Sequence, residues 1–313
     1  MLLNKKHILF IVITALAPLA ALPQCLSSVN PVGGTDNLLV LEKNSLRVIT
    51  YYKFGQGNQY FEGSDRSDFN LIDKAYYNYL STIVGYGLTN KLTLELESGY
   101  FLNKTQKYNL DPPYNLTGNG FSNIVALAKH SLFTEPVKRI YLTAGLGVKI
   151  PCSRNPQWVD KVQLPVEVQP TIGAYGLVFN TSLVKENSGS GMRFFLTSRL
   201  ESNASNKNDY RLGTSVFSSL YISKHLMFPW LKGDWTTILQ IRNEFRAQDK
   251  IASEIKESSG STLFFIAPQI NYVLKDEWYI SVLADIPVYQ DFKGTQLGAG
   301  LGATVILSRT FRF

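Results

Sequence analysis

Charged residues recur at every second position in several stretches of this chain, for example in DWTTILQIRNEFRAQ (234–248) and GMRFFLTSRLE (191–201). Such a row of both signs can do two things. It can select charged solutes at a constriction, or its members can pair across neighbouring strands and stiffen the structure. Both interpretations stay open. The residues that we predict on this shared polar side are Glu95, Glu97, Lys149, Arg193, Arg199, Glu201, Arg211, Arg242, Glu244, Arg246 and Asp285.

Catalytic chemistry has little support. The chain has three histidines. His130 and Ser131 are adjacent in a predicted strand, so their side chains point to opposite faces and cannot form a nucleophile–base pair. His225 falls in a predicted turn, and no GxSxG stretch occurs. We therefore predict no enzyme and no catalytic residue, with a membrane-embedded hydrolase as the least favoured alternative.

Metal and cofactor motifs are also missing. Cys25 and Cys152 have no metal-ligand spacing, and GAGLGATV (298–305) lacks the GKS-type ending and the helix that a nucleotide loop needs. The polar stretches QGNQYFEGSDRSD and SNASNKND lack the ligand spacing of an EF-hand. We predict no cofactor and no metal site.

Alternation with period 2 indicates that strands position the charged residues. In KLTLELESGY (91–100), leucines and charged or polar residues fall on opposite sides, which a strand separates and a helix would scatter. About twelve such stretches occur, longer than the 5–6 residues of an ordinary soluble strand. The predicted strands are 45–57, 76–88, 91–103, 121–133, 138–150, 170–186, 190–203, 210–223, 234–247, 261–274, 276–288 and 297–313.

The connections favour one architecture. Those after odd-numbered strands are mostly long and polar, such as PCSRNPQWVDKVQLPVEVQ, and those after even-numbered strands are mostly short, such as LTN and ENSG. The eighth, KHLMFPWLKG, is a longer exception. Outer-membrane barrels alternate long extracellular loops with short periplasmic turns. The sequence therefore predicts an all-β protein with a single closed antiparallel transmembrane barrel.

The N-terminus predicts export. Lys5 and Lys6 precede an apolar run over 8–16 and a zone of small residues, which is the layout of a cleaved signal peptide. The predicted domains are a signal peptide (1–24), an N-terminal periplasmic segment (25–44) and an outer-membrane barrel (45–313) in a Gram-negative cell. The net charge of +7 suits acidic lipid and lipopolysaccharide but is too dispersed to indicate nucleic acid.

Aromatic residues lie toward the ends of the predicted strands, where amphipathic rings collect at membrane interfaces. We expect them to form such a girdle rather than an interior core. Its predicted members are Tyr76, Tyr77, Tyr79, Tyr100, Phe101, Tyr141, Trp235, Phe245, Trp278, Tyr279, Phe311 and Phe313.

The chain ends in LSRTFRF (307–313), which alternates like a strand that closes a barrel. Leu307 would face lipid and Ser308 the lumen. Phe311 and Phe313 are predicted to form the signal that barrel-assembly machinery reads. Arg309 falls on the lipid side, where only a place near the interface is tolerated.

Two places stay ambiguous. FSNIVALAKHSLF (121–133) alternates poorly, so the directions of Lys129 and His130 are open. Pro268 lies inside a predicted strand and cannot donate a ladder hydrogen bond, so a bulge or kink is expected there.

Several stretches resemble the transporter-like outer-membrane barrels grouped with the meta-pathway of phenol degradation. They are LTGNGFSNIVALAKHSLF (116–133), LTAGLGVKIP (142–151), LPVEVQPTIGAYGLVF (164–179) and the closing IPVYQDFKGTQLGAGLGATVILSRTFRF (286–313). Cys152–Ser153 and Tyr175 depart from the family pattern. The resemblance implies a barrel that transports hydrophobic or aromatic small molecules, and it carries over no catalytic residues.

Taken together, these features predict a channel for small solutes. The alternative is a structural or adhesive barrel with a plugged lumen, whose long loops bind a partner.

Overall fold

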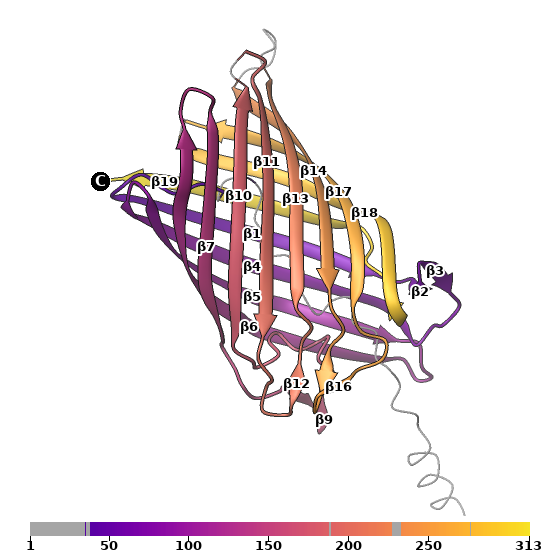
Figure 1. The fold of residues 1–313 in the computed structure, drawn as a ribbon. Helices are drawn as coiled ribbons and strands as arrows, with labels where there is room; N and C mark the ends of the chain where they lie inside the picture. The colour runs from indigo at the N-terminus through magenta and orange to yellow at the C-terminus, as the bar shows by residue number, and fades with distance from the viewer. Residues whose placement is uncertain (1–34, 36–37, 188, 227–232, 276) are drawn as a thin grey trace, which may run out of the picture.

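The structure is a computed structural model that describes residues 35, 38–187, 189–226, 233–275 and 277–313. Twelve long antiparallel strands form a closed barrel, as predicted (Figure 1). Closure comes from β1 and β19, which pair from Ser45↔Arg312 to Phe54↔Ala303. The barrel strands are β1 (Ser45–Gly57), β4 (Ile72–Thr89), β5 (Leu92–Tyr108), β6 (Tyr114–Glu135), β7 (Ile140–Pro151), β10 (Gly176–Asn187), β11 (Met192–Asn203), β13 (Ser215–Leu226), β14 (Asp234–Arg246), β17 (Ser261–Leu274), β18 (Trp278–Leu297) and β19 (Gly302–Arg312).

The two ends of the barrel differ in their connections. We call the end with the short turns 90–91 and 136–139 the turn end, and the opposite end the loop end. The connections at the loop end contain short strands. These are β2 (Tyr60–Gly63) paired with β3 (Asp65–Ser67), β8 (Trp158–Val159) paired with β9 (Val162–Gln163), and β12 (Tyr210–Arg211) in a sheet with β15 (Lys250–Ile251) and β16 (Glu254–Ile255). In Figure 1 the β2–β3 pair projects sideways from the barrel.

The long loop predicted between residues 103 and 121 is wrong. The connection between β5 and β6 is only 109–113, because both strands continue well beyond their predicted ends at 103 and 121. The extension is held by ladder pairs such as Thr105↔Thr117, whose hydroxyl oxygens lie 2.9 Å apart. Cross-strand threonine pairs of this kind stabilise a two-stranded ladder.

The alternation of inner and outer residues follows the sequence. On β19, Val305 and Leu307 are exposed on the outside, whereas Thr304 and Ser308 are buried. Arg309 lies near the turn end, where its Nη2 is 2.5 Å from Glu277 Oε2 and its guanidinium stands 4.9 Å from the Trp278 ring. The arginine that the pattern places on the outer face therefore has a carboxylate partner and a ring contact there. The described residues include no helix that is long and apolar enough to cross a membrane.

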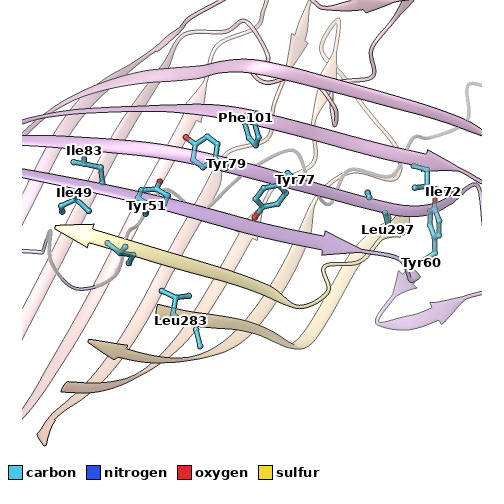
Figure 2. Close-up of a cluster of buried hydrophobic side chains, with 13 residues drawn as sticks. Ile49, Tyr51, Tyr60, Ile72, Tyr77, Tyr79, Ile83, Phe101, Leu283 and Leu297 are labelled. Atoms are coloured by element: carbon cyan, nitrogen blue, oxygen red, sulfur yellow. Dashed lines mark hydrogen bonds between the residues drawn. The ribbon is translucent and has the colours of Figure 1, made fainter. Parts of the chain in front are cut away.

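An aromatic and aliphatic cluster fills one side of the interior (Figure 2). Tyr77, Tyr79 and Phe101 are buried there beside Tyr51. The prediction that Tyr77, Tyr79 and Phe101 belong to the interfacial girdle is therefore wrong. The alternation that turns Glu97 inward also turns Phe101 inward, since they are four residues apart on β5. The rings of Tyr79 and Phe101 are 4.6 Å apart.

The ladder shows no register shift at Pro268, where a bulge or kink was expected, although β18 does not pair with the proline. Pairing of β17 with β18 passes from Ile266↔Ile286 directly to Gln269↔Leu283, so it skips the proline. The register shift itself lies earlier, between Phe264 and Phe265.

Two predicted strands begin too early. The strand predicted from 170 begins at Gly176, and the one predicted from 210 begins at Ser215. The first difference matters most, because the residues before Gly176 fold into the barrel.

Candidate functional site: a charge-paired lumen closed by two segments

A buried ion-pair network crosses the middle of the barrel. Arg199 on β11 donates Nη1 and Nη2 to the two carboxylate oxygens of Glu97 on β5, each at 2.8 Å. Its Nε donates to Glu201 at 2.8 Å, and Lys149 on β7 reaches the other oxygen of Glu201 at 2.8 Å. Because β5 and β11 are separated by three strands in the sheet, the Arg199–Glu97 pair joins separate parts of the wall. Bidentate pairs of this kind fix geometry as well as charge.

A second network lies on the other side of the lumen. Arg242 on β14 contacts Asp285 on β18 and Glu244 on its own strand, each at 2.8 Å. Lys53 on β1 is 3.5 Å from Asp285, and the Arg242 guanidinium lies 4.5 Å from the Phe265 ring. Lys53 was missed by the sequence analysis, although it alternates with exposed residues of β1 and so shares the inner face.

A third pair settles the orientation that the sequence left open. Lys129 points inward and lies 2.6 Å from Glu95, and both are buried. His130, its neighbour, is exposed.

The remaining predicted residues lie away from these networks. Arg193 is exposed and lines a cavity at the turn end, where it pairs with Glu186 at 3.5 Å. Arg246 is buried and lines a small cavity with Ser215 and Glu244. Arg211 was assigned to a barrel strand, but it belongs to β12, outside the barrel wall, is exposed, and donates to the Asn203 carbonyl at 2.9 Å.

The three networks are balanced in charge. Two arginines and three lysines face five carboxylates, in the pairs described above. Buried charges of this kind are tolerated only when each has a well-placed partner. The interior is therefore polar but presents little unmatched charge at mid-height, and it can hold the barrel wall rigid.

The loop-end segment, residues 164–173, folds into the barrel. Lys104 Nζ donates to the Gln169 carbonyl at 3.2 Å, and Thr171 Oγ1 donates to Asn123 Oδ1 at 2.8 Å. Leu164 and Val168 are buried against Leu116 of β6. The sequence analysis placed 164–169 in a long connection and 170–173 at the start of a barrel strand, so it did not predict that this segment enters the lumen.

The turn-end segment, residues 38–44, enters from the opposite side. Thr143 Oγ1 donates to the Leu38 carbonyl at 3.0 Å, and Leu41 N donates to Thr93 Oγ1 at 2.7 Å. The Leu38 side chain is 4% exposed and packs in a cluster with Phe195 and Tyr221. This segment belongs to the region predicted as N-terminal and periplasmic (25–44), whereas the predicted signal peptide (1–24) lies outside the described residues.

Small cavities remain beside these segments. One of about 100 Å³ adjoins the loop-end segment and is lined by Tyr51, Tyr79, Glu97 and Arg199 among others. A larger one of about 460 Å³ adjoins the turn-end segment and is lined by Leu38, Arg47, Arg193 and other residues. Each segment thus occupies space at its own end of the lumen.

The loop end also holds the most perturbed groups outside the barrel wall. Glu167 of the loop-end segment is 1% exposed, and burial raises the pKa of its carboxyl above the usual range. Burial and the neighbouring Asp249 likewise raise the pKa of Tyr210, whose hydroxyl donates to Asp249. In the part of the chain that the structure describes, no group of three His, Cys, Asp or Glu residues is placed to hold a metal ion.

Comparison with solved structures fits this geometry. An outer-membrane channel from Pseudomonas putida F1 superposes with a TM-score of 0.67 over 91% of this chain and 100% of that one, at 13% identity. The chain has an outer-membrane β-barrel fold. The β domain of the Bordetella autotransporter BrkA (TM-score 0.49, 7% identity, 86% and 100% covered) and the toluene transporter TodX of P. putida (0.36, 8%, 87% and 91%) are also similar.

No family model and no curated protein matches the chain. The resemblance to the phenol meta-pathway group therefore stays a prediction.

Proposed function

We propose that this barrel lies in the outer membrane of a Gram-negative cell and passes small solutes through its lumen. The observation that carries the proposal is the closed twelve-stranded wall with exposed leucines and valines outside and paired charges inside. Such a surface is stable only in lipid, and such a lumen favours polar contents. The loop end then faces the exterior and the turn end the periplasm.

Transport requires the two segments to move, since each occupies one end of the lumen. Both are short and are attached to the wall by a few hydrogen bonds and small apolar clusters. Segments with few buried contacts belong to the low-stability part of a protein. The barrel wall can therefore persist while either segment leaves.

The expected solute is small and partly hydrophobic or aromatic. Besides the resemblance noted above, the aromatic cluster of Tyr51, Tyr77, Tyr79 and Phe101 supports this, because it offers ring faces beside the charge-paired wall. Ring faces attract apolar and aromatic groups.

A plugged structural or adhesive barrel is the second candidate. The balanced ion pairs favour it, since such networks rigidify a wall without creating a path. In that case the loops 152–175 and 247–260 would bind a partner. A hydrolase has less support, because the described lumen shows no nucleophile beside a base.

Conductance separates the candidates. The chain, refolded in detergent, should migrate differently on a gel before and after heating, and should fractionate with the outer membrane in cells. In planar bilayers, the channel proposal expects discrete current steps. A fully folded protein that yields no current with either segment in place or removed would contradict the channel and leave the plugged barrel.

Assembly partners are proposed on the same basis. Phe313 is 82% exposed at the end of β19 and so is accessible to assembly machinery. Deleting Phe313 should lower the amount of protein in the outer membrane; an unchanged amount would count against its role as a signal. Phospholipid and lipopolysaccharide are the expected surroundings of the outer wall.

A further inference from the structure

Glu167 holds an unusual position in the loop-end segment. It lies in a short turn, is 1% exposed, and neither of its carboxylate oxygens accepts a hydrogen bond from another residue. Its nearest charged group is Lys256, whose Nζ lies 3.6 Å from Glu167 Oε1. A buried carboxylate normally accepts several hydrogen bonds. Glu167 instead has opposite charge nearby without those hydrogen bonds, so its burial is only partly compensated.

The surroundings of Glu167 are basic. Lys256 comes from loop 247–260 and Lys104 from β5, and Lys104 lies within electrostatic range of both Glu167 and Arg246. The other acid nearby, Asp249, is already engaged: it accepts hydrogen bonds from Gly213 N at 2.7 Å and from the Tyr210 hydroxyl. Without Glu167, Lys256 would lose its carboxylate partner and Lys104 would lose a nearby negative charge.

We propose that Lys104 and Lys256 form a recognition site for the carboxylate of a small organic acid, and that Glu167 is a tethered occupant which such a solute displaces. The inference rests on the proposed channel function, for which it names a class of cargo. The hydrophobic part of such an acid would meet Leu116 of β6, which Leu164 and Val168 cover while the segment is docked.

Displacement is feasible because the docked carboxylate is poorly compensated. Burial raises the pKa of Glu167 even though Lys256 and Lys104 oppose that change. A free carboxylate that can accept hydrogen bonds from both ammonium groups would be held better than one fixed by the backbone of the segment. Binding of the solute and release of the segment would then be the same event.

The test measures binding of butyrate to the refolded full-length chain in detergent by titration calorimetry. Butanamide, which has the same shape without the charge, is the matched probe. In E167A the tethered competitor is absent, so butyrate should bind about tenfold more tightly than to the wild type. K104M and K256M, each combined with E167A, should lose this binding, whereas K224M combined with E167A, which changes an exposed lysine at the turn end, should keep it.

The outcomes are decisive in both directions. Each variant is first shown to fold by its heat-modifiable migration. Equal affinity for butyrate and butanamide, or tight butyrate binding in the K104M and K256M combinations, would overturn the inference. Current steps without selective butyrate binding would overturn it while sparing the channel; selective binding without current in any variant would support the carboxylate site and overturn the channel.

Discussion

The two segments that close the lumen are held in different ways. The turn-end segment 38–44 is attached by neutral contacts: its backbone bonds to two threonine hydroxyls, and Leu38 packs among apolar residues. The loop-end segment 164–173 is attached by Lys104 at its backbone, and it buries the Glu167 carboxylate, which Lys256 compensates only in part. Neutral contacts depend little on salt and pH, whereas charge contacts depend on both. The barrel thus has one passive closure and one that its surroundings can change.

The barrel wall between the two segments is held by the central ion-pair network. Breaking that network should have a larger effect on stability than changing either segment. Arg199→Met leaves Glu97 buried without its bidentate partner and removes one of the two partners of Glu201. Loss of one member of a buried pair costs about 3–5 kcal/mol. The temperature of gel-shift unfolding should fall markedly.

Arg193→Met is the matched control, because its side chain is 56% exposed and its pairing with Glu186 is loose. The control should change stability by less than about 0.5 kcal/mol. Equal destabilisation by both substitutions would show that the central network does not hold the wall.

The next effect concerns the turn-end segment. Leu38→Ala removes a side chain that packs with Phe195 and Tyr221, and truncating a well-buried leucine costs about 2–5 kcal/mol. Most of that cost falls on docking of the segment, so the open fraction seen as current should rise at least tenfold, to the same degree at low and high salt. Leu39→Ala, which truncates a neighbour that is only partly buried, is the control and should raise the current less. A salt-dependent rise would contradict the neutral attachment.

The residues themselves show what a sequence can and cannot predict here. The bounds of β1 and β17 follow from alternation alone, because odd- and even-numbered residues of a strand face opposite sides of the sheet. The pairing of Glu97 with Arg199 does not follow, because it crosses the lumen between strands that are not neighbours, and that distance depends on barrel shear. The loop-end segment escaped prediction because 164–169 reads as an ordinary polar connection, and its docking depends on contacts with β5 and β6 such as Lys104 with the Gln169 carbonyl, which are distant in sequence.

The loop-end segment should respond to pH. The pKa of Glu167 is raised when the segment is docked, so the protonated form favours docking. Docking is therefore strongest at low pH and weakens as pH rises through the raised pKa, which lies above the ordinary range of a glutamate. The groups that act on Glu167 are Lys256, Lys104 and Asp249, and Tyr210 lies close by.

Single-channel current should accordingly increase with pH over that window, and Glu167→Gln should remove the dependence. Glu186→Gln, which changes an acid at the turn end, should leave it in place. A pH dependence that survives in Glu167→Gln would assign the response to another group.

The smallest effect tests a single neutral contact. Thr143→Val keeps the shape of the side chain but removes the hydroxyl that donates to the Leu38 carbonyl at 3.0 Å. One such hydrogen bond contributes about 0.5–1.5 kcal/mol, so the open fraction should rise by a factor of roughly two to ten, without any change in its salt or pH dependence. Thr197→Val, at another buried threonine, on β11, is the control. Because the two ends are attached independently, Thr143→Val combined with Glu167→Gln should change the docking free energies additively; a clear departure from additivity, measured as current, would show that the two closures communicate through the lumen.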